Sequence, residues 1–185
     1  MAESQIQNFN HLKIHSQFSI CEGAIKIDDL KEISKEKKIR SLALCDTSNL
    51  CGALEFAEKI SKVGTQPIIG TQINFKLDDT IGLLPLFALN EIGYKRIIEL
   101  SSLSYLNNDG TLDPHLNFEE LLKNNEGVAI FSGTINGLVG QLFNKGKFSE
   151  IEKLYSKLKQ KYGDKFYIEI QRHGDQNEIS FEKFN

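Results

Sequence analysis

The segment His11-Leu12-Lys13-Ile14-His15-Ser16 decides how the beginning of this chain folds, because polar and apolar residues alternate along it. In an extended strand alternate side chains share a face, so the two histidines and Lys13 point to one side, opposite Leu12 and Ile14. The pattern predicts a strand over residues 10–16 with one polar face. The histidines on that face can bind a metal ion, whereas a lysine ammonium group offers only hydrogen-bond donors.

Downstream, short apolar runs alternate with helical patterns. Strands are predicted at residues 41–45, 67–75, 81–89, 127–131 and 166–170. Helices are predicted at residues 28–38, 53–63, about 94–100, 118–124 and 151–162. Strands that alternate with helices favour an α/β fold with parallel pairing. Residues 178–185 indicate the first turns of one more helix, and about six strands with few covering helices is an unusual end for a β/α barrel. We therefore expect a piece of a longer protein.

Composition narrows the class of protein. A chain of 185 residues is long enough for one hydrophobic core. A net charge of −3 and a pI near 5.8 indicate no overall preference for nucleic acid. Three cysteines without a paired spacing are typical of reduced thiols in the cytoplasm. The longest apolar run, residues 81–89, is far shorter than the ~18 residues of a membrane span, so no membrane association is expected.

Polar residues follow five of the predicted strands. These residues are His15, Asp46-Thr47, Gln72, Gly133-Thr134 and His173. In β/α barrels the functional side chains lie at the carboxyl ends of the strands. The pattern therefore predicts one polar site built from several strand ends. Asp46 also suits a second role, as the N-cap of the helix that follows it.

Four segments resemble, in the same order, the PHP (polymerase and histidinol phosphatase) domain at the N-terminus of bacterial DNA polymerase III alpha subunits. They are residues 10–19, 46–52, 66–70 and 167–174. The resemblance implies a distorted β/α barrel of PHP type, incomplete at its C-terminus. It assigns residues 9–185 to this domain and residues 1–8 to an N-terminal tail.

The resemblance also identifies the positions that bind metal ions in metal-competent members. Three of them are matched here, by His15, Asp46 and His173. Five carry other residues, namely Lys13, Thr47, Gln72, Leu103 and Thr134. A leucine offers no ligand, and an ammonium group repels cations over a few ångströms. We expect a vestigial site that binds no metal, in which Lys13 pairs with Asp46 in place of the ions.

For function, the resemblance implies the N-terminal region of a replicative DNA-directed DNA polymerase in the cytoplasm. Nucleotidyl transfer with Mg²⁺ and the main contacts with DNA would belong to other parts of that protein. The region itself is expected to be a catalytically inactive scaffold, with no cofactor of its own. It would support the rest of the polymerase and provide a docking site for the separate proofreading exonuclease subunit.

Other functions remain open from the sequence. The main alternative is a PHP phosphoesterase or 3′–5′ exonuclease that uses Mn²⁺ or Zn²⁺. A free-standing binding module is a third possibility, and an anion held by Lys13, His15 and His173 is a fourth. Lysines between residues 153 and 165 are compatible with DNA contact, but most of them fall on the polar side of an amphipathic helix, where a solvated face is the commoner cause.

Overall fold

The computed structural model describes residues 9–106 and 110–185. The chain divides into two compact units, Met1–Thr71 and Gln72–Asn185. The predicted tail over residues 1–8 lies outside the described residues, as does part of the loop predicted after residue 106. The assignment of residues 9–185 to a single domain stays a prediction.

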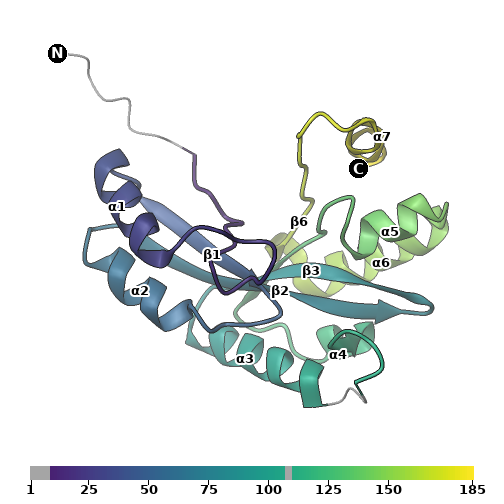
Figure 1. Ribbon diagram of the computed structural model, residues 1–185. Coiled ribbons are helices and arrows are strands. Elements are labelled where there is room, and N and C mark those ends of the chain that lie inside the picture. The colour runs from purple at the N-terminus through teal and green to yellow at the C-terminus, as the bar shows by residue number, and fades with distance from the viewer. Residues whose placement is uncertain (1–8, 107–109) are drawn as a thin grey trace. The chain divides into compact units, whose positions relative to one another are not determined.

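The first unit is built from two helices and two neighbouring strands (Figure 1). Its elements are α1 (Ile27–Lys37), β1 (Ser41–Thr47), α2 (Ala53–Ser61) and the first half of β2 (Gln66–Leu77). Helices α1 and α2 pack against each other. The core of this unit consists of buried apolar side chains from both helices and β1: Ile27, Leu30, Ile39, Leu42, Leu44, Phe56 and Ile60. These elements agree with the predicted ranges to within a few residues.

The strand predicted at residues 10–16 is not formed. The segment forms two isolated parallel bridges, from Ile14 to Leu44 and from Ser16 to Ile25. Its main-chain bonds with β1 are donated by Ala43 N to His11 O, at 2.9 Å, and by Cys45 N to Ile14 O, at 2.8 Å. The ladder stops because the Ser16 N–H donates to the side chain of Asp46, at 2.6 Å, instead of to a neighbouring strand. From Ser16 the chain turns into a loop that Gln17 N closes by donating to Ile25 O, at 3.0 Å. We call residues 16–25 the clasp loop.

The strands of the second unit follow the order β2-β3-β5-β6, with β4 also paired to β2. Their bounds are Thr80–Ala88 for β3, His115–Asn117 for β4, Val128–Phe131 for β5 and Phe166–Tyr167 for β6. The predicted α/β class is confirmed, but the expected parallel pairing is only partly correct. Strand β4 runs parallel to β2, and β6 runs parallel to β5. Strand β3 is antiparallel to β5. Only Asp78 and Asp79 link β2 to β3, and so short a link joins antiparallel strands.

Helices accompany these strands (Figure 1). They are α3 (Glu91–Leu106), α4 (Phe118–Lys123), α5 (Leu138–Asn144), α6 (Phe148–Tyr162), the 3-10 turn η1 (Gly163–Lys165) and α7 (Gln176–Phe184). Helices α3 and α5 both pack on β3, and α5 also packs on α6. Gly82 permits the close approach of β3 to α5, because a Cβ there would lie 2.5 Å from Leu138 Cα. Helix α7 confirms the helical turns predicted near the end of the chain, whereas α5 was not predicted.

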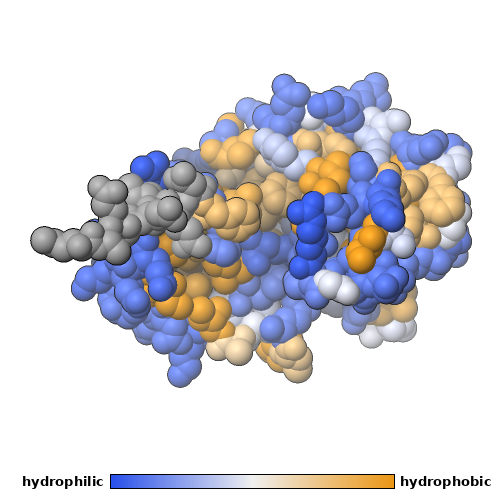
Figure 2. All heavy atoms as spheres, turned by 90° about the horizontal axis from the view of Figure 1, so that it is seen from above, coloured by the Kyte–Doolittle hydropathy of each residue, from blue (hydrophilic) through white to orange (hydrophobic). Residues whose placement is uncertain are grey.

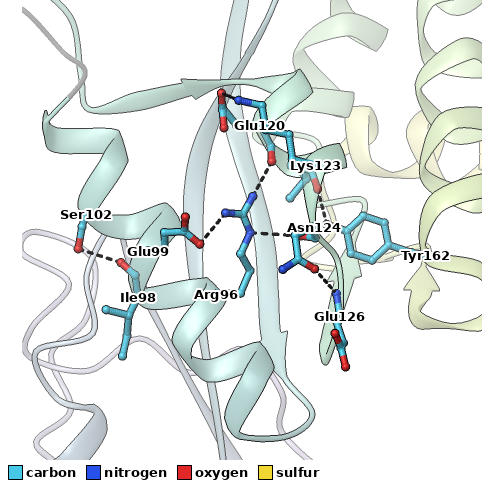
Figure 3. Close-up of polar contacts among 10 residues, drawn as sticks. Arg96, Ile98, Glu99, Ser102, Glu120, Lys123, Asn124, Glu126 and Tyr162 are labelled. Carbon is cyan, nitrogen blue, oxygen red and sulfur yellow. Dashed lines mark hydrogen bonds and ion pairs between the residues drawn. The ribbon is translucent and has the colours of Figure 1, made fainter.

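A buried arginine joins α3 to the end of α4 (Figure 3). The Arg96 side chain is 6% exposed and forms an ion pair with Glu99 at 2.7 Å. Its guanidinium group also donates to the main-chain oxygens of Glu120, at 2.7 Å, and Asn124, at 3.2 Å. The last carbonyl groups of a helix have no partner within it, so Arg96 satisfies groups that α4 cannot satisfy itself.

In the part of the chain that the structure describes, no helix combines the length and the apolar character needed to cross a membrane.

Candidate functional site

The carboxyl group of Asp46 is the centre of a buried polar cluster in the first unit. Asp46 lies near the end of β1 and is 1% exposed. Its Oδ1 accepts hydrogen bonds from Ser16 N, at 2.6 Å, and Ser19 Oγ, at 2.7 Å. Its Oδ2 accepts from Ser16 Oγ, at 2.8 Å. Both carboxyl oxygens are therefore engaged by neutral donors from a loop about thirty residues earlier in the chain.

Further hydroxyl groups extend this cluster. Thr71 Oγ1 donates to the main-chain oxygen of Asp46, at 2.6 Å. Thr47 N donates to Ser19 Oγ, at 3.0 Å, and Thr47 Oγ1 donates to the carboxylate of Glu22. We call Ser16, Ser19, Asp46, Thr47 and Thr71 the Asp46 cluster. Four members, Ser16, Ser19, Asp46 and Thr71, are almost completely buried. The cluster therefore attaches the clasp loop to the end of β1 through buried hydrogen bonds.

The clasp loop also contains a glycine, Gly23, and any larger residue at this position would displace neighbouring main-chain atoms. A Cβ added to Gly23 would lie 2.1 Å from Ser16 O and 2.6 Å from His15 O. Gly23 N donates to Ser19 O, at 2.9 Å. Close main-chain contacts at Gly23 therefore fix the conformation of the loop. This conformation holds Ser16 and Ser19 in place to donate hydrogen bonds to Asp46.

His15 and Lys13 precede the clasp loop and are both partly buried. The Nδ1 atom of His15 is buried, and among the described residues it has no hydrogen-bond partner. Asp46 takes its side-chain hydrogen bonds from serines, and the predicted pairing of Lys13 with Asp46 stays a prediction. Asp46 does not cap α2 through its side chain; Gly52 occupies the N-cap position, without a side-chain cap.

The remaining predicted positions lie in the second unit. Gln72 and Thr134 are buried, at 5% and 8% exposure, and Leu103 lies on α3, partly buried. The Oγ1 of Thr134 accepts a hydrogen bond from Asn136 N, at 3.3 Å, within its own turn. Leu103 has no side-chain group that can form a hydrogen bond, and the side chain of His173 is bonded to Glu178.

His173 is an exposed residue at the start of α7. Its side chain is 72% exposed. Glu178 Oε1 lies 2.7 Å from His173 Nδ1, and Glu178 Oε2 accepts a hydrogen bond from His173 N, also at 2.7 Å. These bonds to His173 lower the pKa of Glu178 below its ordinary value of 4.5. Asp175 and Glu178 also form a capping box for α7, so His173 takes part in a helix N-terminus.

Few lone pairs of the Asp46 carboxylate remain for a metal ion. A carboxylate has about four lone-pair positions, and the three hydrogen bonds from Ser16 and Ser19 leave little of the Asp46 carboxylate for a cation. Within each unit, over the described residues, no group of three or more His, Cys, Asp or Glu side chains lies close enough to hold a metal ion. Zinc centres of catalytic type use three protein ligands for each ion.

Sequence patterns identified Asp46 but missed the serines that bind it. Ser16 and Ser19 lie in the segment 10–19 that resembles the PHP domain, but the resemblance assigned them no role, and their contacts with Asp46 span 30 and 27 residues. A pair of serines three residues apart in a loop more often makes local turns. Only the three-dimensional fold reveals this role.

Comparison with known proteins identifies a family. Residues 11–173 match the family model described as the PHP domain. The chain is 35% identical to the DNA polymerase III subunit alpha of Caulobacter vibrioides, over 94% of this chain and 16% of that protein. It is 37% identical to the DNA polymerase III subunit alpha of Rickettsia felis, over 89% of this chain and 14% of that protein. The chain thus spans about a sixth of the length of these relatives.

Among solved structures, the chain is similar to an amidohydrolase from Chromobacterium violaceum. The two share 15% sequence identity with a TM-score of 0.44, over 53% of this chain and 34% of that one. A likeness this low supports no conclusion about function.

Proposed function

Because the chain belongs to the PHP domain family, we propose that it is the PHP region of a DNA polymerase III alpha subunit, a DNA-directed DNA polymerase of DNA replication. One observation carries the proposal: identity of 35–37% to curated alpha subunits over about nine-tenths of this chain or more. Nucleotidyl transfer with Mg²⁺ and the main contacts with DNA then belong to the part of the protein that this chain does not span. The location that fits this role is the cytoplasm.

Within that protein we assign this region the role of a scaffold without catalytic activity. The Asp46 cluster supports this assignment, because it uses both carboxyl oxygens of Asp46 to hold the clasp loop. Lys13 supports it through charge, since an ammonium group disfavours cations nearby. Leu103 supports it through chemistry, since a hydrocarbon side chain offers no ligand atom. The region would need no cofactor and would provide a docking surface for the proofreading exonuclease subunit.

The rival function is a PHP phosphoesterase or 3′–5′ exonuclease that uses Mn²⁺ or Zn²⁺. One observation favours it: the buried Nδ1 atom of His15 lacks a hydrogen-bond partner among the described residues. Buried polar atoms in native structures usually have a partner, so this atom is free to accept a hydrogen bond or to bind an ion.

Two assays separate these functions. The product of the full reading frame is tested for primer extension with Mg²⁺, which the proposal expects. The same protein is then tested for hydrolysis of a chromogenic phosphate ester and of a labelled single strand with Mn²⁺, beside His15→Ala and Asp46→Ala. Hydrolysis that both substitutions abolish would establish the rival function. Extension without hydrolysis supports the scaffold, and absence of extension contradicts polymerase parentage.

Docking of the proofreading subunit needs its own measurement. The polymerase and the exonuclease subunit from the same organism are mixed and analysed by gel filtration with light scattering. Co-elution that is lost on deletion of residues 1–185 is the expected result. Co-elution that survives this deletion would place the docking site elsewhere in the polymerase.

A further inference from the structure

We propose that a basic surface on the first unit binds the phosphate backbone of duplex DNA, in addition to the main DNA contacts elsewhere in the protein. Five exposed side chains make up this basic surface: Lys35, Lys37, Lys38, Arg40 and Lys62. The inference rests on the proposed function, because a DNA polymerase has duplex DNA as its product. It adds to that function a binding surface in this region.

The basic surface is built from the segments that follow α1 and α2. Thr65 Oγ1 donates to Ile39 O, at 2.7 Å, and Gln66 N donates to Arg40 O, at 2.8 Å. Ile39 is 8% exposed and belongs to the core of the first unit, whereas its neighbours Lys38 and Arg40 are exposed. Packing and hydrogen bonds therefore fix the main chain that carries these cations, and their side chains remain in solvent.

The surroundings of these side chains are open. A Cβ added to Gly64, two residues after Lys62, would meet no described atom within 4 Å. Helices α1 and α2 pack side by side, on the left of Figure 1. Figure 2 shows mainly hydrophilic side chains, in blue, on the left, where these helices lie. A large polyanion can therefore approach the basic surface.

The positive charge of the basic surface is largely uncompensated. Lys37 lies 3.8 Å from Glu36, and both side chains are mostly exposed. In the part of the chain that the structure describes, the other four members have no ion pair. Lys59 on α2 provides a contrast, because it pairs with Asp28 at 2.6 Å and with Glu55 at 2.7 Å. Carboxylates of the first unit thus neutralise Lys59 and leave the basic surface charged.

The helix dipole explains only part of this charge. Lys35 and Lys37 lie in the last turn of α1, and Lys62 is the C-cap of α2. A positive charge is favourable at such helix ends. However, Arg40 lies outside both helices, and neither α3 nor α5 has a basic residue in its last turn. Helix ends alone therefore do not account for five cations in one place.

The other residues of the two segments favour duplex DNA as the ligand. In residues 35–40 and 61–66, which the structure describes in full, no large apolar side chain is exposed. Protein interfaces usually have an apolar centre and few lysines. These segments also contain no aromatic residue on which the bases of a single strand could stack. Clustered cations without either feature suit the phosphate groups of a duplex.

The basic surface is separate from the Asp46 cluster. Arg40 directly precedes β1, and Asp46 lies near the other end of this strand. A strand rises about 3.3 Å per residue, so roughly 20 Å of extended chain separates the two residues. Binding of DNA at the basic surface therefore needs no group of the Asp46 cluster.

The salt dependence of duplex binding by the full-length protein tests this surface. Fluorescence anisotropy with a labelled blunt duplex gives the slope of log K against log[salt]. The triple substitution Lys38→Gln, Arg40→Gln and Lys62→Gln should make this slope shallower by about three, because each phosphate contact contributes about one. The charge-conserving set Lys38→Arg, Arg40→Lys and Lys62→Arg should keep the slope of the wild type.

The matched control removes the same charge from the second unit. Lys153→Gln, Lys165→Gln and Lys183→Gln alter three side chains that are also exposed, and the slope should stay close to that of the wild type. Phosphate contacts carry no sequence information, so the loss in the first triple variant should be equal for A·T-rich and G·C-rich duplexes.

Each other outcome has a defined meaning. An equal change of slope in the control attributes the effect to net charge and overturns the surface. Binding of polyglutamate that weakens as much as binding of the duplex assigns the surface to acidic protein segments, which also overturns it. An unchanged slope in a protein that extends primers overturns the surface and leaves the proposed function standing. Absence of primer extension, with the slope changed as expected, contradicts the proposed function alone.

Discussion

The sequence resemblance predicts ligand positions of the PHP family at both Asp46 and His173, yet the structure uses the two residues in different ways. Asp46 is 1% exposed and accepts three hydrogen bonds from residues 27 and 30 positions away. The side chain of His173 is 72% exposed, and its partner Glu178 lies five positions away. One residue stabilises tertiary structure, and the other stabilises a helix end. A matched family position therefore does not determine what a side chain does in this chain.

The largest effect expected from this difference is on Asp46. Asp46→Ala leaves the Ser16 N–H and the hydroxyl groups of Ser16 and Ser19 without their acceptor. Each buried donor left unsatisfied costs about 1–3 kcal/mol, so we expect the free energy of unfolding to fall by about 3 kcal/mol or more in urea titration.

The matched control for this substitution is Asp28→Ala. Asp28 is 68% exposed and pairs with Lys59 at 2.6 Å. Surface ion pairs contribute about 0–1 kcal/mol, so this variant should remain close to the wild type. Equal losses in the two variants would contradict the role assigned to the Asp46 cluster.

The next largest effect is expected at Gly23. Gly23→Ala places a Cβ against main-chain atoms of Ser16 and His15, which cannot move away as a flexible side chain can. Overpacking of this kind costs about 1–3 kcal/mol. Hydrogen exchange should show faster exchange over the clasp loop, with little change on α6. At Gly64 a Cβ would meet no atom within 4 Å, and Gly64→Asn provides the comparison, since asparagine tolerates positive φ. If the amides of the clasp loop in Gly23→Ala exchange as in the wild type, Gly23 does not hold the loop in the way described.

The smallest effect is expected at the start of α7. The bonds from His173 lower the pKa of Glu178, so its contribution to stability is complete above its ordinary value of 4.5 and is lost as the pH falls through the lower pKa of the folded state. The protection factors of α7 amides, taken relative to the intrinsic exchange rate at each pH, should therefore fall below about pH 4.5 in the wild type. Glu178→Gln should show low protection of α7 already at pH 7, with little further loss at acid pH. Protection factors of α7 that are unchanged by acid in the wild type would contradict the capping role of Glu178.

The regular elements of this fold were largely predictable, because burial imposes a period on the sequence. Ile151, Leu154 and Leu158 recur at helical spacing, and α6 buries all three. Helix α5 escaped prediction because it is only seven residues long and contains Gly140, a poor helix former. The prediction of a strand at residues 10–16 was wrong, because the alternation of polar and apolar residues does not reveal that Ser16 N donates to the side chain of Asp46.

The candidate site was predictable only in part. A polar residue after a buried strand identified Asp46, and its burial agrees with a role inside the fold. The partners of Asp46 could not be predicted, since a hydroxyl group fits many surroundings and spacing along the chain does not encode contacts thirty residues apart. His173 shows the converse: a matched motif gave no indication that Glu178 would hold its ring at the start of a helix.

Calorimetric titration of the protein with Mn²⁺ tests the central claim most directly, namely that the carboxyl oxygens of Asp46 are committed to Ser16 and Ser19. The expected result is no stoichiometric binding, with heats equal to those of Asp46→Ala. Tight stoichiometric binding in the wild type that is lost in both His15→Ala and Asp46→Ala would contradict the claim.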